Sequence, residues 1–189
     1  FNGGTLITRH ADLQKDILMG SSVGSSSATW IMGSGDATNT VPNLVVGYTA
    51  ANNALLITNG GTLFVSGDFI DVGETSAAPN NRVLVSDPGS LLHNNGNFSV
   101  GYDSSGNQLV VSNGAVIANQ FGSLGLFGAA NTAVVTGAGS VWSNHLDLSI
   151  GSESGANLLV VTNGGTVSAA NIFLGAVDRI ADNRVIVAG

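Results

Sequence analysis

Twelve Asp and Glu residues are the first candidates for acid–base chemistry in this chain of 189 residues. Cleavage of sugar polymers commonly requires two nearby carboxyl groups, one acting as acid and one as base or nucleophile. Asp68 and Asp71 are the closest pair in a well-patterned segment, and Asp71 stands between Ile70 and Val72. Because alternate residues of a strand face opposite sides, Asp71 should point outward. Arg82 is the one cation near this pair or at an equivalent position one repeat away. We therefore interpret the pair as solvated surface acids and predict no catalytic residue.

Metal or cofactor binding is equally weakly indicated. Two short segments combine an acid with Ser and Asn: Asp103, Ser104 and Asn107, and Glu153, Ser154 and Asn157. So few carboxylates cannot supply the six to eight oxygens that Ca²⁺ takes. The histidines are isolated and lack zinc-site spacing, although His93 falls at a predicted inward position: His10, His93 and His145. With no cysteine in the chain, we predict no metal site and no cofactor.

The charge balance excludes several classes of partner. The net charge is −7, and only five residues are Lys or Arg. Binding to nucleic acid or to an anionic membrane surface requires clustered cations, which this chain cannot provide. The few charges and the many Gly, Asn, Ser and Thr residues also disfavour helices with a solvated charged face. These features favour an all-β protein.

An asparagine followed by two apolar residues in alternate positions recurs along the chain. From Asn53 onward, successive copies are 28, 26, 24, 26 and 26 residues apart. Alternation with a period of two is typical of a strand with one buried face. Ser27, followed by Thr29 and Ile31, takes the same place one period earlier. We expect the asparagines to form a ladder of amide hydrogen bonds at a bend. The predicted ladder contains Asn53, Asn81, Asn107, Asn131, Asn157 and Asn183.

A glycine introduces a second strand in each period. The segment NGGTL occurs at 2–6 and at 59–63, and NGGTV occurs at 163–167. The glycines predict a turn where φ is positive or where two backbone segments approach closely. In each period the first inward side chain is expected two residues later, as at Leu91, Val116 and Val141. The predicted glycine column contains Gly35, Gly61, Gly89, Gly114, Gly139 and Gly165.

A third strand ends at a corner glycine that follows two alternate apolar residues, as in Leu44, Val46 and Gly47. One period departs from this rule, because Gly128 after Phe127 fits the corner and Gly125 stands where an apolar residue is expected. Three strands per period form a core only if successive periods stack as parallel strands ~4.8 Å apart. The sequence therefore predicts a parallel β-helix, or β-solenoid, of about seven coils of about 26 residues. We expect residues 1–189 to form a single domain, of a handedness that the sequence leaves open.

The first period is longer than the others, with 16 residues from Gly4 to Gly20 where about 12 are usual. The surplus near residues 8–16 is polar and contains two of the five cations. We expect a protruding loop or small cap there, and it is the first candidate for a specific surface contact. The alternative is a merely solvated insertion. The candidate contact residues are Arg9, His10, Asp12, Lys15 and Asp16.

Four aromatic residues suggest an alternative use of the surface. Tyr48 and Tyr102 each follow a corner glycine, and Trp30 and Trp142 are predicted at outward strand positions. Exposed rings can stack against sugars. An extended carbohydrate-binding groove is therefore the alternative to ordinary surface packing.

Both ends of the sequence lie inside a repeat. The last residues, NRVIVAG, followed by the first, FNGGTL, match the repeat at 157–167 with two surplus residues. Unpaired strand edges tend to recruit other chains. We therefore expect copies to continue one another, either within a longer chain or as subunits stacked head to tail. No basic and apolar leader precedes Phe1, so we interpret the chain as a mature or excised piece.

The segments NLLVVTNGGTV, GAGSVWSN and SIGSESGAN resemble repeats of bacterial autotransporter passengers and of surface proteins with autotransporter-associated β-strand repeats. The resemblance covers nearly the whole chain. It implies secretion, an extracellular or cell-surface location and a stalk or adhesin role, and it transfers no catalytic residue. We therefore expect a non-enzymatic structural fibre whose partners are further copies of itself, surface glycans or a receptor on a host or neighbouring cell. The alternative is a carbohydrate-binding or polysaccharide-degrading β-helix.

Overall fold

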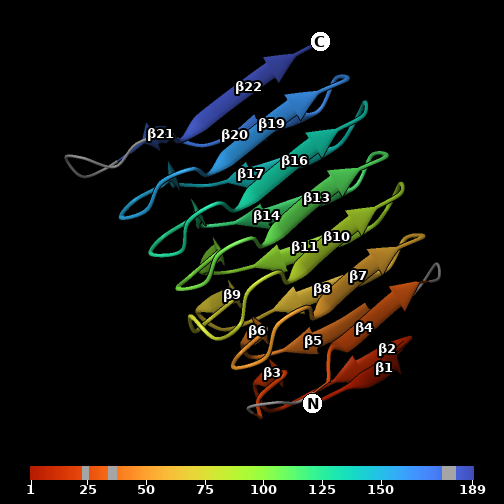
Figure 1. The fold of residues 1–189 in the computed structure, drawn as a ribbon. Helices are drawn as coiled ribbons and strands as arrows, with labels where there is room; N and C mark the ends of the chain where they lie inside the picture. The colour runs from red at the N-terminus through yellow and green to blue at the C-terminus, as the bar shows by residue number, and fades with distance from the viewer. Residues whose placement is uncertain (23–25, 34–37, 176–181) are drawn as a thin grey trace.

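The chain folds into a β-solenoid whose coils stack along one axis (Figure 1). The computed structural model describes residues 1–22, 26–33, 38–175 and 182–189. Within these ranges every regular element is a strand, and no helix capable of spanning a membrane is found. The predicted fold class, an all-β parallel β-helix of about seven coils, is confirmed.

Three parallel sheets form the sides of the solenoid, and each coil contributes one strand to each sheet. Sheet A contains β1 (Gly4–Ile7), β4 (Ala28–Gly33), β7 (Ala54–Thr58), β10 (Arg82–Ser86), β13 (Gln108–Ser112), β16 (Thr132–Thr136), β19 (Leu158–Thr162) and β22 (Arg184–Ala188). Sheet B contains β2 (His10–Asp12), β5 (Thr38–Val41), β8 (Thr62–Val65), β11 (Leu91–Asn94), β14 (Val116–Asn119), β17 (Val141–Asn144) and β20 (Thr166–Ser168). Sheet C contains β3 (Ile17–Met19), β6 (Leu44–Val46), β9 (Phe69–Val72), β12 (Asn97–Val100), β15 (Phe121–Leu124), β18 (Asp147–Ile150) and β21 (Asn171–Leu174).

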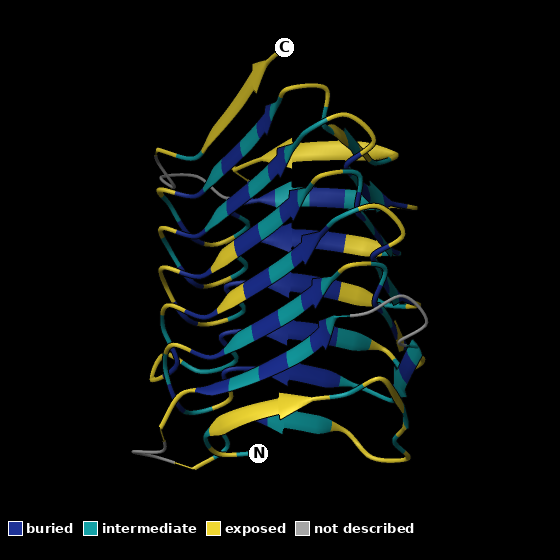
Figure 2. Ribbon diagram, turned by 90° about the vertical axis from the view of Figure 1, so that its right-hand side faces the viewer, coloured by how far each residue is buried: buried dark blue, intermediate teal, exposed yellow. Residues whose placement is uncertain are grey.

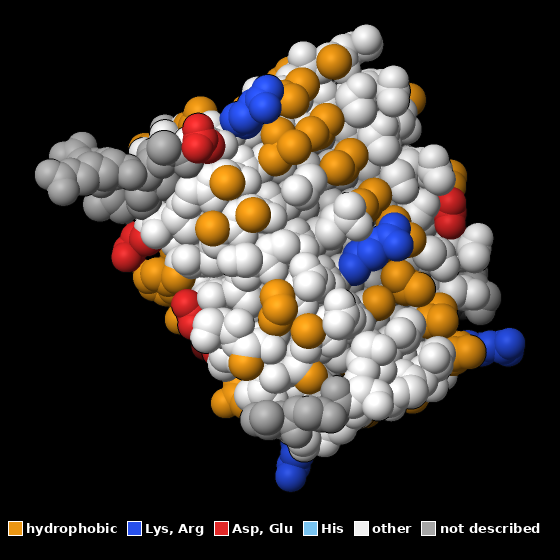
Figure 3. All heavy atoms as spheres, viewed as in Figure 1, with side chains coloured by type: hydrophobic (Ala, Val, Ile, Leu, Met, Phe, Trp, Pro, Cys, Tyr) orange, Lys and Arg blue, Asp and Glu red, His pale blue; other side chains and the backbone are white. Residues whose placement is uncertain are grey.

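The core consists of columns of like side chains. In β13, Leu109 and Val111 are fully buried, whereas Gln108 is exposed. The parallel register places Val111 between Val85 and Val135 of the adjacent coils. Figure 2 shows the buried columns in the middle of the solenoid and exposed strands at its ends. On the face shown in Figure 3, charged side chains are few and isolated.

The strand of sheet A in the second coil is offset by one residue from the prediction. Ala28 rather than Ser27 corresponds to Asn53, and Ala28 N donates to Asn53 Oδ1 at 2.9 Å. Trp30 and Met32 are fully buried, so the prediction that Thr29 and Ile31 face inward is wrong. Because side chains alternate along a strand, an offset of one residue exchanges the two faces.

The start of the chain also differs from the prediction. Gly4 begins β1 in sheet A, whereas the identical NGGTL at 59–63 leads into β8 of sheet B. The segment predicted as a loop near 8–16 supplies β2, which pairs with β5. Since β1 and β22 both belong to sheet A, the first residues do not supply the strand that follows β22. The predicted tail-to-head match of the two ends is therefore wrong in its register.

Sheet B has its inward positions one residue later than predicted in three coils. The buried residues are Leu92, Ile117 and Trp142, whereas Leu91, Val116 and Val141 are only partly buried. The predictions of an inward His93 and an outward Trp142 are wrong for the same reason. His93 lies half-buried on the outer face, with its ring centroid 5.6 Å from that of Phe64.

This register also redefines the glycine column of sheet B. The aligned glycines with positive φ, between 78° and 85°, are Gly60, Gly89, Gly114, Gly139 and Gly164. Gly61 and Gly165 lie one residue further along the chain. At these positions the backbone of the preceding coil lies too close to leave room for a side chain. A Cβ on Gly61 would lie 2.6 Å from the carbonyl oxygen of Met32. The predicted Gly35 lies outside the described residues.

The irregular coil keeps the common register. Leu124 and Gly125 take the corner, with φ of 75° at Gly125, so the assignment of the corner to Gly128 is wrong. Gly122 stands at the inward position between Phe98 and Leu148. A Cβ there would lie 2.8 Å from Leu148 Cδ1. The rings of Phe98 and Trp142, from coils on either side, meet with centroids 6.1 Å apart, so neighbouring coils fill the space that Gly122 leaves.

Candidate functional site

The asparagine ladder is a continuous buried feature at the bend before sheet A. Asn107 Oδ1 accepts hydrogen bonds from Asn81 N at 2.9 Å and from Asn81 Nδ2 at 3.1 Å. Asn107 Nδ2 donates to Asn131 Oδ1 at 2.9 Å and to Ser104 O at 3.0 Å. Amide-to-amide bonds of this kind link Asn53, Asn81, Asn107, Asn131, Asn157 and Asn183. The ladder satisfies buried polar groups at every bend, which is a structural role.

A second, shorter ladder in sheet B was not predicted. Asn119 Nδ2 donates to Asn144 Oδ1 at 2.7 Å, and Asn119 Oδ1 accepts from the buried Trp142 Nε1 at 2.9 Å. Asn94 occupies the same column and donates to Asn97 O at 2.6 Å. Their spacing of 25 residues is visible in the sequence, but their inward orientation depends on the corrected register.

The residues considered for calcium serve the first ladder. Ser104 and Ser154 are buried, and each accepts a hydrogen bond from an asparagine three residues later, at 2.9 and 3.1 Å. Within the described part of the chain, no three His, Asp or Glu side chains come together as metal ligands.

The candidate contact residues lie in the first coil, at the N-terminal end of the solenoid. Arg9, His10, Asp12, Lys15 and Asp16 are all exposed. Gln14 Nε2 donates to Asp12 Oδ1 at 2.9 Å, and Asn43 Nδ2 donates to Asp16 Oδ1 at 3.1 Å. The strand β2 spreads these side chains along the coil instead of gathering them in a loop.

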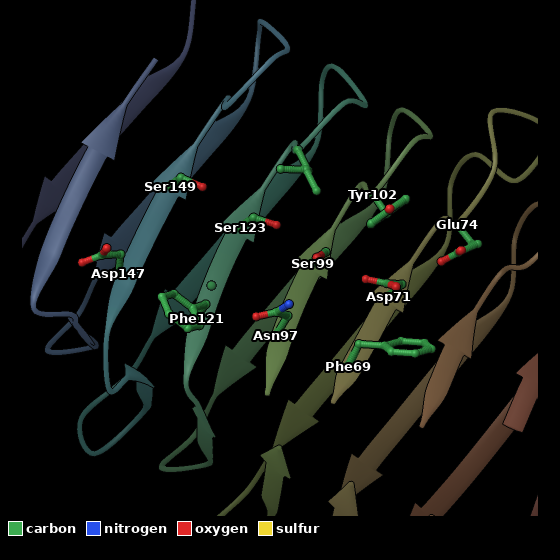
Figure 4. A pocket seen from close by; sticks show the side chains of 12 residues that line it. Phe69, Asp71, Glu74, Asn97, Ser99, Tyr102, Phe121, Ser123, Asp147 and Ser149 are labelled. Atoms are coloured by element: carbon green, nitrogen blue, oxygen red, sulfur yellow. The ribbon is translucent and has the colours of Figure 1, made fainter. Parts of the chain in front are cut away.

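A groove of about 630 Å³ follows the outer face of sheet C across β9, β12, β15 and β18 (Figure 4). Three columns of side chains form it. The floor consists of Asp71, Ser99, Ser123 and Ser149, aligned by the register of the four strands. One wall consists of Phe69, Asn97, Phe121 and Asp147, and the other of Glu74, Tyr102 and Leu126. Among the residues that the structure describes, no Lys or Arg lines the groove.

Asp71 is the most unusual group in this groove. It points outward as predicted, but it is only 6% exposed, so its interpretation as a solvated acid is wrong. Its partner is Glu74, one residue past the corner glycine, rather than Asp68. Burial, the Glu74 charge and a hydrogen bond with Glu74 raise the pKa of Asp71 to about 8, and a hydrogen bond with Ser99 opposes this. At neutral pH the Asp71 carboxyl group is therefore largely protonated.

Polar atoms without partners also mark the groove. Ser123 is 9% exposed, and its buried Oγ has no hydrogen-bond partner among the described residues. Glu74 Oε2 is likewise buried and has no partner in the part of the chain that the structure describes. Ser149 differs, since its Oγ accepts from Ser152 Oγ at 2.8 Å.

Aromatic rings stand on both walls. Phe121 is 44% exposed, and Tyr102 packs edge-on against Phe127 with centroids 5.7 Å apart. Of the four predicted surface aromatics, Tyr102 alone lines the groove. Trp30 and Trp142 are fully buried, and their Nε1 atoms donate to Thr8 Oγ1 and Asn119 Oδ1. The outward spacing of Asp71, Ser99 and Ser123 is the sequence signal for this groove.

Comparisons with known proteins assign neither a family nor a fold relative. No protein-family model matches the chain, and searches of curated proteins and of solved structures find no significant similarity. The class that the fold defines is a three-sheet β-solenoid, and the groove and the two ladders are its distinguishing features.

Replacing Asp71 should change how stability depends on pH. The folded state holds a proton on Asp71 up to about pH 8, whereas the unfolded chain releases it near 3.8. The free energy of unfolding should therefore fall as pH rises from about 4 to 8, by at most about 1.4 kcal/mol per unit from this group. In Asp71→Asn this contribution disappears. The free energy of unfolding of the variant, relative to that of the wild type, should therefore increase as pH rises. Urea denaturation at several pH values measures the difference.

Asp68→Asn is the matched control, because Asp68 does not line the groove. It should retain the wild-type pH dependence. A constant difference between wild type and Asp71→Asn from pH 4 to 8 would contradict a buried, protonated Asp71.

Proposed function

We propose that this chain is a structural segment of an extracellular or bacterial cell-surface fibre or adhesin stalk, in which coils continue one another, rather than an enzyme. The observation that carries the proposal is the apolar face of the last coil. Ile172 and Leu174 are each 51% exposed, although they continue the columns of the fully buried Leu148 and Ile150. Val187, 76% exposed, continues the column of Val161.

Stacking of a further coil would bury these side chains and pair the open strand edges. Both effects favour association, because apolar burial and strand pairing are what join the coils within the solenoid. The added coil can come from the same polypeptide or from a second copy. At the other end of the solenoid, Leu6 is 37% exposed, while Phe1 and Leu13 pack partly against the core.

Other features support a structural role at the cell surface. The two asparagine ladders occupy the repeated polar positions with protein–protein hydrogen bonds. The repeat segments resemble those of exported bacterial surface proteins, and the chain combines no cysteine with few charges. A stalk of this kind would bind surface glycans or a receptor on a neighbouring cell.

The association of purified protein tests the stacking of coils. The wild type should self-associate with increasing concentration and form filaments, with an axial repeat of roughly 34 Å for seven coils. Ile172→Lys combined with Val187→Lys should remain monomeric with an unchanged circular dichroism spectrum, because both side chains are already exposed. Sedimentation velocity and negative-stain electron microscopy measure both states.

Phe64→Lys is the control, since Phe64 is 37% exposed on the outer face of sheet B, away from the coil ends. This variant should assemble like the wild type. A wild type that stays monomeric at all concentrations would contradict stacking between separate copies and leave only coils of the same polypeptide.

A further inference from the structure

The groove on sheet C has features that the structural role does not require. Ser123 and Asp71 are buried in its floor, and no described residue forms a hydrogen bond with Ser123 Oγ or Glu74 Oε2. Unpartnered buried polar atoms are costly in a folded protein, and at functional sites they are commonly satisfied by a ligand. A molecule with hydrogen-bonding groups in the groove would satisfy both atoms.

The charges in the groove limit the ligand. Its acids are Asp71, Glu74 and Asp147, and within the described ranges no cation lines it, so these carboxyl groups disfavour an anionic ligand. Asp147 already accepts a hydrogen bond from Asn171 Nδ2 at 2.8 Å. Because its pKa is raised, the Asp71 carboxyl group can donate as well as accept a hydrogen bond, as a hydroxyl ligand requires. A cation would be bound better by an ionised carboxylate at this position.

The spacing of the lining groups matches an extended ligand. The floor serines repeat once per coil, at ~4.8 Å, so four strands span about 14 Å along the solenoid axis. Phe69 and Phe121 stand two coils apart on one wall, and Tyr102 stands on the other. Rings of this kind stack on the apolar faces of sugars, whose hydroxyl groups point sideways.

We propose that this groove binds an uncharged oligosaccharide lying along the solenoid axis. Phe69, Phe121 and Tyr102 provide stacking surfaces, and Ser123, Glu74 and Asp71 bind hydroxyl groups. This inference is independent of the stacking of coils, because the groove lies on the side of the solenoid.

Calorimetric titration of the full chain with defined oligosaccharides tests this inference. The uncharged probes are linear hexasaccharides of glucose, mannose, xylose and N-acetylglucosamine. Hexagalacturonate serves as the anionic probe and hexaglucosamine as the cationic probe. At least one uncharged hexasaccharide should bind, and hexagalacturonate should not.

Two substitutions should weaken that binding. Phe121→Ala should raise Kd about tenfold through lost stacking, and Ser123→Ala should raise it several-fold. Phe64→Ala is the matched control, because its ring is exposed to a similar extent outside the groove, and it should leave Kd unchanged. Circular dichroism melting curves check that each variant is folded.

Three results would overturn the inference. The first is no binding of any uncharged hexasaccharide by folded wild type, and the second is binding that Phe121→Ala and Ser123→Ala leave unchanged. The third is tighter binding of hexaglucosamine than of every uncharged probe, which would assign the groove to a cationic ligand.

Discussion

Val111→Asp should destabilise the solenoid by about 4 kcal/mol or more, enough to unfold the central coils. Val111 is fully buried, with a relative exposure of 0%. It lies between Val85 and Val135 of the adjacent coils. A carboxylate at this position would lose its hydration without gaining a counter-charge. Urea denaturation followed by far-ultraviolet circular dichroism measures the loss.

Gln108→Lys in the same strand is the control. Gln108 is exposed at the start of β13, so the free energy of unfolding should change by no more than about 0.5 kcal/mol. Equal tolerance at positions 108 and 111 would show that the register of β13 is wrong.

Asn107→Leu should cost about 3 kcal/mol or more, although leucine is similar in size and apolar. Asn107 Oδ1 accepts from the backbone N–H and the side-chain amide of Asn81, and Asn107 Nδ2 donates to Asn131. The substitution leaves the buried Asn81 N–H without a partner, which costs about 1–3 kcal/mol. Asn81 Nδ2 keeps its bond to Ala78 O and Asn131 Oδ1 keeps the Asn107 N–H, so each loses one of two partners, at about 1 kcal/mol per lost bond. Equilibrium unfolding gives the total, and hydrogen exchange at the Asn81 amide should show that protection is lost first at this bend.

Gln108→Leu is the control for the same change of chemistry one residue away, at an exposed position. It should leave both stability and Asn81 protection near wild-type values. A loss below about 1 kcal/mol in Asn107→Leu would mean that the ladder contributes little to folding.

The sequence by itself predicted the parallel β-helix, because its repeats carry the two properties that stacking requires. Apolar residues alternate after each asparagine, and corner glycines recur at nearly constant spacing. Like residues then align automatically when the coils stack. The six asparagines of the ladder could be predicted for the same reason. A position that is buried in every coil requires the same amide in every repeat.

The register within a coil was harder to predict, because a shift of one residue exchanges the inner and outer faces. NGG contains two glycines, and only the partner strands decide that Gly60 and Gly164 take the positive-φ turn. The same ambiguity placed Trp142 outside. The identical NGGTL segments enter different sheets, so local sequence did not determine the position of the first strand.

The groove on sheet C could not be predicted from the sequence, because its residues come together only in the tertiary structure. Asp71 and Glu74 are separated by a corner, and Ser99, Ser123 and Phe121 come from two other coils. Their proximity results from the parallel stacking of sheet C, and their burial results from the residues after each corner, which form one wall of the groove. A sequence pattern indicates which residues face outward, but the burial that raises the pKa of Asp71 exists only when neighbouring coils are assembled.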